Sequence, residues 1–412
     1  MLEPRQGGCA LQDDRRNTAV FERGTDWDDI ARELDQALES DRPPRAETIA
    51  IRLKDQVWRN ACAAAAAVAG DYDWSSPIAC KARDELAAFA RALLNAPADA
   101  PATLTTGGTE SVFLAVKAAR DWARTHKPEI TAPVMLMGRS AHPCLSKAAQ
   151  NLGVREIRVP LTQDHRTDPA ALRQAVTPDT IMVVASLPSD SRGMCDDVPV
   201  IATIAREHGL WCHVDACLGG FLVPYLKRLG HALPDFDFRV PGVRSISLDQ
   251  HKYAYAPTGI STLMLRDAAD LSHQRFAFSD WDGPAKSYDY FAGTRPIEAA
   301  VAAWATMRQI GDDGYLERAR LVQANTEHLF AEIAKLPGVT VLNRPEAGAV
   351  HFSLDRVPLD KLAAELRVLG HRRFNLTADP AAVIVYAGPL SDTRVIGTYI
   401  EDLKTLIARL RR

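Results

Sequence analysis

The chain has 412 residues, of which 47% are hydrophobic and 25% are charged, and its formal net charge is -3. This length suffices for two domains with a sizeable core, and the composition is typical of soluble globular proteins, which argues against disordered and fibrous classes. The nearly balanced charge provides no broad basic field for nucleic acid or for an anionic membrane.

The seven cysteines are scattered along the chain and lack the paired CxxC spacing of zinc sites. Their odd number also disfavours a disulfide framework. The longest apolar run, at residues 61–70, is too short to span a bilayer, and the first residues contain no apolar run of the kind found in secretory signals. We therefore expect a soluble, cytoplasmic protein that holds no metal.

The N-terminal residues predict an arm rather than a domain. Residues 5–17, RQGGCALQDDRRN, are polar, and we expect them to be mobile. Residues 26–41 have the apolar spacing of an amphipathic helix. We assign residues 1–60 to this arm and helix.

From residue 61 onward, helical patterns alternate with short apolar segments. The predicted strands lie at residues 134–138, 154–161, 180–187, 210–216, 244–249 and 260–266. This alternation predicts an α/β fold in which a mostly parallel sheet has helices on both faces. We assign residues 61–310 to this large domain. Residues 311–412, in which short strands and helices follow a long helical tract, are assigned to a small C-terminal α+β domain.

The first candidate site is the segment LTTGGTES at residues 104–111, directly before a strong helical pattern. Its glycines permit a tight turn, and a helix N-terminus at Gly108 and Thr109 offers donors to an anion, most naturally a phosphate. The alternative is an ordinary helix cap formed by Thr109 or Ser111. The segment lacks the Walker lysine and the Rossmann spacing, so it does not indicate a nucleotide.

The second candidate is Asp215, in LWCHVDACLGG at residues 210–220. It ends an apolar strand, and ligands of open α/β sheets collect at the carboxyl ends of strands. A carboxylate in this position needs a cationic partner. A structural ion pair or a turn role is the alternative, and His213 could equally be a packed core histidine.

The third candidate is Lys252, which lies between two apolar strands in SLDQHKYAYAPTG at residues 247–259. Adjacent strand ends could bring it to Asp215. A lysine away from bulk water and near other cations has a lowered pKa, which frees its amine to attack carbonyl groups. The alternative is a lysine in a surface loop.

One cofactor accounts for all three candidates. Pyridoxal phosphate has an aldehyde that a lysine amine captures, a ring nitrogen that a carboxylate keeps protonated, and a phosphate that suits a glycine-rich helix start. The residues alone therefore predict pyridoxal phosphate at the carboxyl edge of the sheet.

Five segments resemble, in the same order, the signature segments of the fold-type I pyridoxal phosphate enzymes of the group II decarboxylase superfamily. They are TTGGTES, AHPCLSKAA, HVDACLGGF, HKYAYAPTG and AGTRP. Within this superfamily, HVDACLGGF and HKYAYAP are most similar to sphingosine-1-phosphate lyase. The resemblance covers roughly residues 75–300 and implies the fold-type I pyridoxal phosphate-dependent transferase fold.

The resemblance implies catalytic roles for four side chains. Lys252 would form the Schiff base with the cofactor, and Asp215 would pair with its pyridine nitrogen. His142 of AHPC would stack on the ring face. Tyr255 would place a phenol near the reacting group, unless it only packs beneath the cofactor.

The resemblance also implies how the phosphate is bound. Gly108 and Thr109 would contact it, with help from His251. Gly293 and Thr294 of AGTRP would reach the phosphate of the neighbouring subunit, because the sites of this superfamily lie at a homodimer interface.

We therefore expect a lyase that cleaves a carbon-carbon bond of a small amine or amino acid. Loss of an aldehyde from a β-hydroxy amine and loss of carbon dioxide from an amino acid both remain open. Sphingosine-1-phosphate lyases usually carry a second lysine where this chain has Thr258, and this difference favours decarboxylation or another amino alcohol. A noncatalytic relative that retains the cofactor is a further alternative, whereas a binding protein without cofactor would leave Lys252 and Asp215 unexplained.

Overall fold

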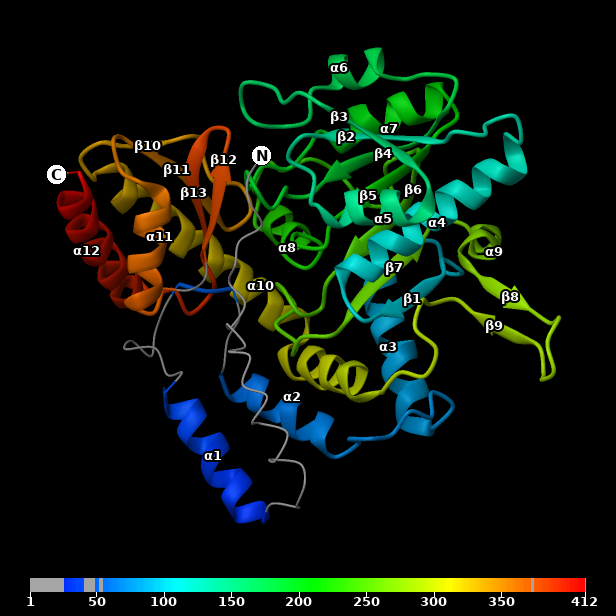
Figure 1. The fold of residues 1–412 in the computed structure, drawn as a ribbon, viewed down its shortest axis with the longest axis horizontal. Helices are drawn as coiled ribbons and strands as arrows, with labels where there is room; N and C mark the ends of the chain where they lie inside the picture. The colour runs from blue at the N-terminus through cyan, green and yellow to red at the C-terminus, as the bar shows by residue number, and fades with distance from the viewer. Residues whose placement is uncertain (1–25, 41–48, 52–54, 372–373, 412) are drawn as a thin grey trace, which may run out of the picture.

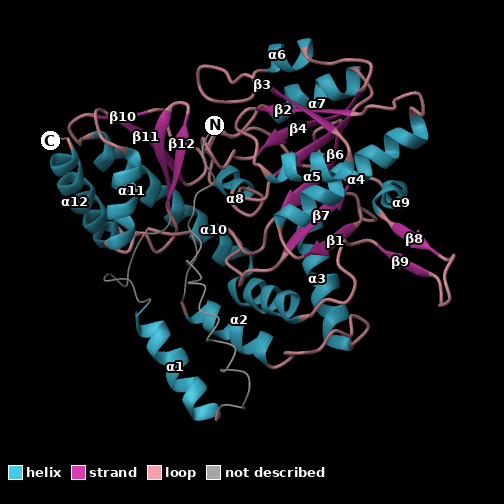
Figure 2. Ribbon diagram, in the orientation of Figure 1, coloured by secondary structure: helices cyan, strands magenta, loops and turns pink. Residues whose placement is uncertain are grey.

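The computed structural model describes residues 26–40, 49–51, 55–371 and 374–411. Two sheets lie side by side, and each is covered by helices (Figures 1 and 2). The polar segment predicted to be mobile, at residues 5–17, lies outside the described residues.

The large sheet has seven strands. Their order is β1 (Ala102–Thr105), β7 (Ser261–Leu265), β6 (Val243–Leu248), β5 (Trp211–Asp215), β4 (Thr180–Ser186), β2 (Val134–Gly138) and β3 (Arg155–Val159). β7 runs antiparallel to both of its neighbours, and the other pairs are parallel. The predicted mostly parallel, mixed sheet is therefore confirmed, with β1 as an additional edge strand.

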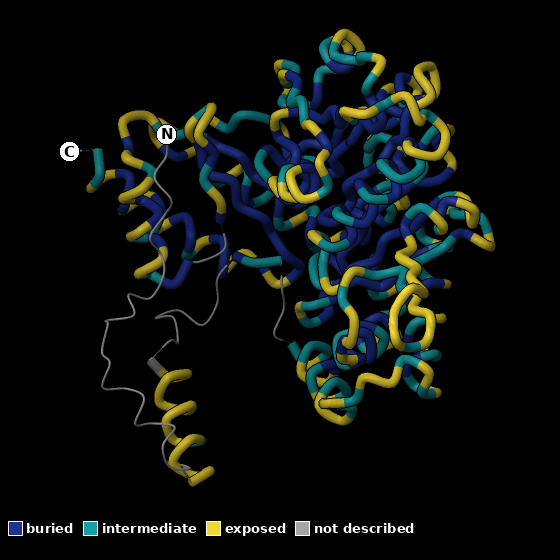
Figure 3. The backbone as a smooth tube through the Cα atoms, turned by 45° about the vertical axis from the view of Figure 1, so that its right-hand side comes forward, coloured by how far each residue is buried: buried dark blue, intermediate teal, exposed yellow. Residues whose placement is uncertain are grey.

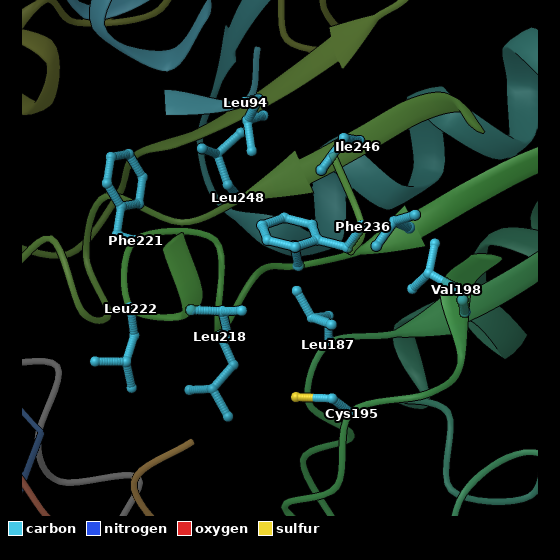
Figure 4. Packing of buried hydrophobic residues seen from close by; sticks show 14 of the residues in the cluster. Leu94, Leu187, Cys195, Val198, Leu218, Phe221, Leu222, Phe236, Ile246 and Leu248 are labelled. Atoms are coloured by element: carbon cyan, nitrogen blue, oxygen red, sulfur yellow. The ribbon is translucent and has the colours of Figure 1, made fainter. Parts of the chain in front are cut away.

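The central strands are apolar because helices cover both faces of the sheet. Along β4, Val183 and Ala185 belong to one buried cluster, whereas Met182 and Val184 belong to another. Figure 4 shows part of the first cluster, where Leu218 and Phe236 pack near Leu187. The helices of this domain are α3 (Pro77–Leu93), α4 (Gly108–His126), α5 (Cys144–Leu152), α6 (Pro169–Gln174), α7 (Val198–Glu207), α8 (Val223–Arg228) and α9 (Leu271–Gln274).

The small C-terminal domain contains an antiparallel sheet of four strands. Their order is β10 (Val339–Val341), β11 (Ala349–Leu354), β13 (Ala381–Tyr386) and β12 (Phe374–Ala378). Helices α11 (Leu359–Val368) and α12 (Thr393–Leu410) pack on this sheet around a separate buried cluster.

A long helix, α10 (Glu298–Ala334), joins the two sheets (Figure 1). It is interrupted at Gly311, where φ is 65° and the backbone is not helical. The predicted boundary between residues 310 and 311 falls at this break, although the three predicted domain ranges remain predictions.

The remaining elements lie at the periphery. α1 (Trp27–Ser40) is the predicted amphipathic helix and is largely exposed (Figure 3), and α2 (Gln56–Ala66) contains most of the alanine run. A hairpin of β8 (Phe276–Phe278) and β9 (Lys286–Tyr288) projects from the large domain. Among the described residues, no helix combines the length and the apolar character needed to cross a membrane.

Candidate active site

A cavity of about 350 Å³ lies at the carboxyl ends of β4, β5 and β6, next to the start of α4. Ser186 and Asp215 end β4 and β5, and Asp249 follows β6. Parallel strands present their carboxyl ends at one edge, so side chains from distant segments converge there. Six of the predicted site residues line the cavity: Gly108, Thr109, His142, Asp215, His251 and Lys252.

The start of α4 is built to approach the cavity closely. A Cβ atom added to Gly108 would lie 2.8 Å from both Asp249 Oδ1 and Cys217 Sγ, so a larger residue would clash with these two side chains. Glu110 stabilises the preceding turn, because its Oε2 accepts hydrogen bonds from the backbone N–H and the hydroxyl of Thr106. Its Oε1 accepts the backbone N–H of Phe291, which fastens a distant loop to the same turn.

Asp215 is buried and ionised. Its Oδ1 accepts hydrogen bonds from the backbone N–H of Cys217 at 3.2 Å and from the Ser247 hydroxyl at 3.4 Å. Burial raises the pKa of Asp215, but the positive charge of Lys252 and the hydrogen bond from Cys217 help to outweigh burial and lower the pKa below its usual value. A carboxylate in this state can hold a cation at the cavity wall.

The Lys252 ammonium lies 3.1 Å from Asp249 Oδ2, and the side chain of Asp249 is only 2% exposed. Burial lowers the pKa of Lys252, but Asp249 and the other negative groups around it raise the pKa above its usual value. The expectation of a lowered pKa is therefore wrong for this structure. It assumed neighbouring cations, whereas the fold places carboxylates beside the amine.

The two histidines of the cavity are held in different ways. His142 is exposed, and its Nδ1 accepts the backbone N–H of Cys144 at the start of α5. His251 Nδ1 lies 2.7 Å from the carbonyl oxygen of Ile260, so this nitrogen is the donor, and Nε2 lies 3.5 Å from Asp249 Oδ2. Both rings are thus fixed at the edge of the cavity.

Three predicted site residues do not line this cavity. Tyr255 is buried; its ring stacks on that of Tyr315, and the guanidinium of Arg318 lies 5.0 Å from its centroid. These contacts match the alternative of a packing role. Gly293 and Thr294 are exposed on the surface of this chain, so their contact with a neighbouring subunit stays a prediction.

Asp249 is the cavity residue that sequence reasoning missed. It comes directly after β6, just as Asp215 ends the neighbouring parallel strand β5. The same criterion that selected Asp215, a carboxylate at a strand's carboxyl end, would have selected Asp249.

A seven-stranded, mostly parallel sheet with a lysine, a carboxylate and a glycine-rich helix start at its carboxyl edge defines a class of protein. Residues 73–355 match the pyridoxal-dependent decarboxylase conserved domain, and the chain belongs to this family.

Within the family, sphingosine-1-phosphate lyases are prominent among similar proteins. The Arabidopsis thaliana sphingosine-1-phosphate lyase is 38% identical over 60% of this chain and 46% of its own length. The chain thus spans about half the length of the first curated relatives that it matches. The structure of the Burkholderia pseudomallei sphingosine-1-phosphate lyase is 30% identical, with a TM-score of 0.87, and 95% of this chain and 92% of that chain are covered.

A decarboxylase is similar as well. The L-aspartate decarboxylase of Thermococcus kodakarensis is 31% identical over 74% of this chain and 77% of its own length. The relatives therefore include both an aldehyde-releasing and a carbon dioxide-releasing activity.

The residues present fit pyridoxal phosphate. The start of α4 lines the cavity with Gly107, Gly108 and Thr109, so a group bound there would meet the N-terminus of this helix. Asp249 Oδ1 is buried and has no hydrogen-bond partner among the described residues, so the cavity holds an acceptor for a donor that the protein does not supply. Together with the amine of Lys252 and the ionised Asp215, this is the donor and acceptor set that the cofactor requires.

Proposed function

We propose that the chain binds pyridoxal phosphate in this cavity and acts as a carbon-carbon lyase on a small amine or amino acid. The observation that carries the proposal is the convergence of Lys252, Asp215, His142 and the start of α4 on one cavity. Bound there, the cofactor supplies an electron-withdrawing ring that stabilises negative charge at the amine-bearing carbon of the substrate.

Each of these groups has a role for which its surroundings suit it. Lys252 would hold the aldehyde carbon, and Asp249, 3.1 Å from its amine, orients the side chain. Asp215 stays ionised at neutral pH because its pKa is lowered, so it can keep a proton on the ring nitrogen. His142 would cover the ring face.

The start of α4 would hold the phosphate. Gly108 lets the start of the helix lie against Asp249 and Cys217 at the cavity wall, and Thr109 adds a hydroxyl and a backbone N–H near the positive end of the helix dipole. His251 lies at the same wall of the cavity and would contribute there as well.

We further propose a homodimer with shared active sites, in which Gly293 and Thr294 of one subunit reach the phosphate of the other. Both residues are exposed, and their loop is tied to the α4 turn through the hydrogen bond between Phe291 and Glu110. The six described cysteines are free, which supports the further proposal of a cytoplasmic location.

The two bond-breaking outcomes differ in what supports them. The similarity to the Burkholderia lyase over nearly the whole chain favours release of an aldehyde from a β-hydroxy amine. The similarity to the aspartate decarboxylase, together with Thr258 at the position of the second lysine of sphingosine-1-phosphate lyases, favours release of carbon dioxide from an amino acid. Thr258 is exposed and does not line the cavity.

Cofactor binding is tested directly. The protein is mixed with pyridoxal phosphate, reduced with borohydride, digested and analysed by mass spectrometry. A pyridoxyl group on Lys252 is the expected result. The matched control is Lys147→Ala, which should leave the labelling of Lys252 unchanged because Lys147 is exposed on α5. A protein that gains no visible absorption and no label on Lys252 would contradict the proposal.

The reaction is tested by supplying amino acids and β-hydroxy amines, with and without a phosphate group, and measuring carbon dioxide and aldehyde separately. Formation of either product supports a lyase, and the product identifies the type. If Thr258→Lys leaves activity on phosphorylated substrates unchanged, Thr258 does not determine the choice.

A further inference from the structure

Behind Asp215, away from the helix start, buried side chains of β5 and β6 form a continuous row of hydrogen bonds. On β5 the row contains Trp211, His213 and Asp215, which are two residues apart. On the neighbouring strand β6 it contains Ser245, which pairs with His213, and Ser247, which pairs with Asp215. Because side chains alternate between the faces of a strand, all five lie on one face of the sheet.

The distances connect the row from end to end. Trp211 Nε1 donates to Ser245 Oγ at 2.8 Å, and His213 Nδ1 lies 2.8 Å from the same oxygen. His213 Nε2 lies 3.3 Å from Ser247 Oγ, and this hydroxyl lies 3.4 Å from Asp215 Oδ1. His213 and both serines are fully buried, so the row is shielded from water.

The fixed donor at one end determines which way every proton points. Indole nitrogen can only donate, so Ser245 Oγ accepts from Trp211 and has its own proton left to give. The only other group within hydrogen-bond distance of Ser245 Oγ among the described residues is His213 Nδ1. If the hydroxyl donates to it, Nδ1 carries no proton; donation from Nδ1–H to the Ser245 backbone is the alternative that the NMR experiment below distinguishes. Burial lowers the pKa of His213 to about 4, which keeps the ring neutral, and with Nδ1 unprotonated its single proton is on Nε2.

The same reasoning carries the direction on to Asp215. His213 Nε2–H donates to Ser247 Oγ, and the Cys217 thiol, 3.3 Å away, donates to it as well. Both acceptor positions of this hydroxyl are then used, so its proton goes to Asp215 Oδ1. Every donor in the row points toward the carboxylate.

We propose that His213 is a positioning residue. With Trp211, Ser245 and Ser247 it forms a relay, a chain of hydrogen bonds whose donors all point toward Asp215. The relay stabilises the ionised carboxylate of Asp215, which thereby keeps the cofactor's ring nitrogen protonated. The role toward the cofactor rests on the proposed function. Both hydrogen bonds that Asp215 accepts from described residues use Oδ1, which leaves Oδ2 for a ligand in the cavity.

Charge also acts on Asp215, and it is a separate influence from the relay. Burial raises the pKa of Asp215, whereas the charge of Lys252 lowers it, and a charge on His213 or His142 would lower it further. The relay consists of uncharged donors. Its contribution therefore persists whatever the charge on Lys252, and substitutions that leave every charge in place can isolate it.

The first experiment needs no cofactor. Protein with ¹⁵N-labelled histidine is examined by NMR near pH 7, and the His213 resonances are assigned by their loss in His213→Gln. The relay requires a neutral ring with its proton on Nε2. A proton on Nδ1, or a charged ring, would overturn the relay even if the protein binds no cofactor.

The second experiment uses the cofactor-loaded protein, prepared with pyridoxal phosphate that is ¹⁵N-labelled in the ring. The pH dependence of the ring-nitrogen shift reports its protonation without any turnover. We expect Ser247→Ala to weaken protonation about tenfold, the effect of losing one hydrogen bond to a charged group. Ser245→Ala should have a smaller effect in the same direction, and His351→Gln, another fully buried histidine, should have none.

A relay also predicts how the effects of the two serine substitutions combine. The double variant Ser245→Ala/Ser247→Ala should behave like Ser247→Ala alone, because the chain is already cut next to Asp215. Additive effects, or an unchanged ring nitrogen in Ser247→Ala, would overturn the proposal. A wild-type protein that takes up no cofactor would refute the proposed function instead, and the histidine NMR experiment would still decide the direction of the relay.

Discussion

The large and the small domain each carry one fully buried histidine on a central strand, and their surroundings differ. His213 on β5 has both ring nitrogens within hydrogen-bond distance of serine hydroxyls. His351 on β11 reaches Thr377 Oγ1 at 3.3 Å with Nε2, and its Nδ1 has no hydrogen-bond partner among the described residues. Equal burial therefore does not imply an equal role.

The charges around the two rings also differ. Burial lowers the pKa of both, to about 4 for His213 and about 3 for His351. The carboxylate of Asp215 partly opposes this effect at His213, whereas Arg192 and His165 add to it at His351. The hydrogen bonds of His213 lead to a carboxylate beside the cavity, whereas His351 lies near the basic groups Arg192 and His165.

The largest difference between the two domains should appear when lysines are removed. Lys252→Ala should lower turnover by at least about a thousandfold, because the covalent attachment and the nucleophile are lost together. Lys361→Ala, on the exposed surface of α11, should leave it unchanged. Steady-state rates on the substrate identified by the product screen check this, and substantial activity in Lys252→Ala would contradict the assignment.

Acid should destabilise both domains through their buried histidines. The folded pKa values lie below the usual value near 6.5, so the unfolded chain binds more protons as the pH falls from about 6.5 toward 4, and stability decreases through this window. For His213 the loss by pH 4 is on the order of 3 kcal/mol.

Urea unfolding at pH 7 and at pH 4 measures this loss. His213→Gln and His351→Gln should each reduce the difference in the free energy of unfolding between the two pH values, even if each variant is less stable at pH 7. An unchanged difference in both variants would show that these rings do not control the acid response.

A smaller change should follow from removing the charge beside Lys252. Asp249 raises the pKa of Lys252 and burial lowers it, so Asp249→Asn should allow the amine to lose its proton at lower pH. The rate of borohydride-trapped labelling by pyridoxal, measured against pH, should shift toward lower pH.

Asp190→Asn is the matched control for this shift, because Asp190 also lines the cavity but is not among the groups that shift the pKa of Lys252. A shift toward higher pH in Asp249→Asn, or an equal shift in the control, would mean that the ion pair does not set the protonation of Lys252.

The smallest expected effects come from replacing one glycine in each domain with alanine. Gly108→Ala places a Cβ atom 2.8 Å from Asp249 and Cys217, so it should weaken cofactor binding and cost about 1–3 kcal/mol of stability. Gly397, in α12, has no neighbouring atom within 4 Å, and Gly397→Ala should stabilise the protein by about 0.5–1 kcal/mol. Cofactor titration and urea unfolding measure both effects, and equal results at the two positions would contradict this reading of Gly108.

Local patterns predicted much of the large domain. Continuous apolar segments such as residues 180–187 form strands because helices cover both faces, and the glycines at 107 and 108 mark the start of α4. β1 was not predicted because its four residues are too few to show a period. The β8–β9 hairpin was missed for the same reason.

The electrostatics of the site could not be predicted in the same way. Lys252 and Asp215 were identified from their positions at strand ends, but the sign of the pKa shift of Lys252 depends on Asp249, whose approach is a property of the folded sheet. The hydroxyls of Ser245 and Ser247 are unremarkable in sequence. They gain significance only from the parallel register that sets them opposite His213 and Asp215.

Glu110 holds the turn before α4 with one carboxylate oxygen and the backbone of Phe291 with the other. If the loop that carries Gly293 and Thr294 meets a second copy of the chain, as proposed, this carboxylate links cofactor binding to self-association. Thermodynamic linkage is reciprocal, so the factor by which the cofactor strengthens assembly equals the factor by which assembly strengthens cofactor binding. Dilution of the protein should then release the cofactor, and the apparent affinity becomes a function of protein concentration.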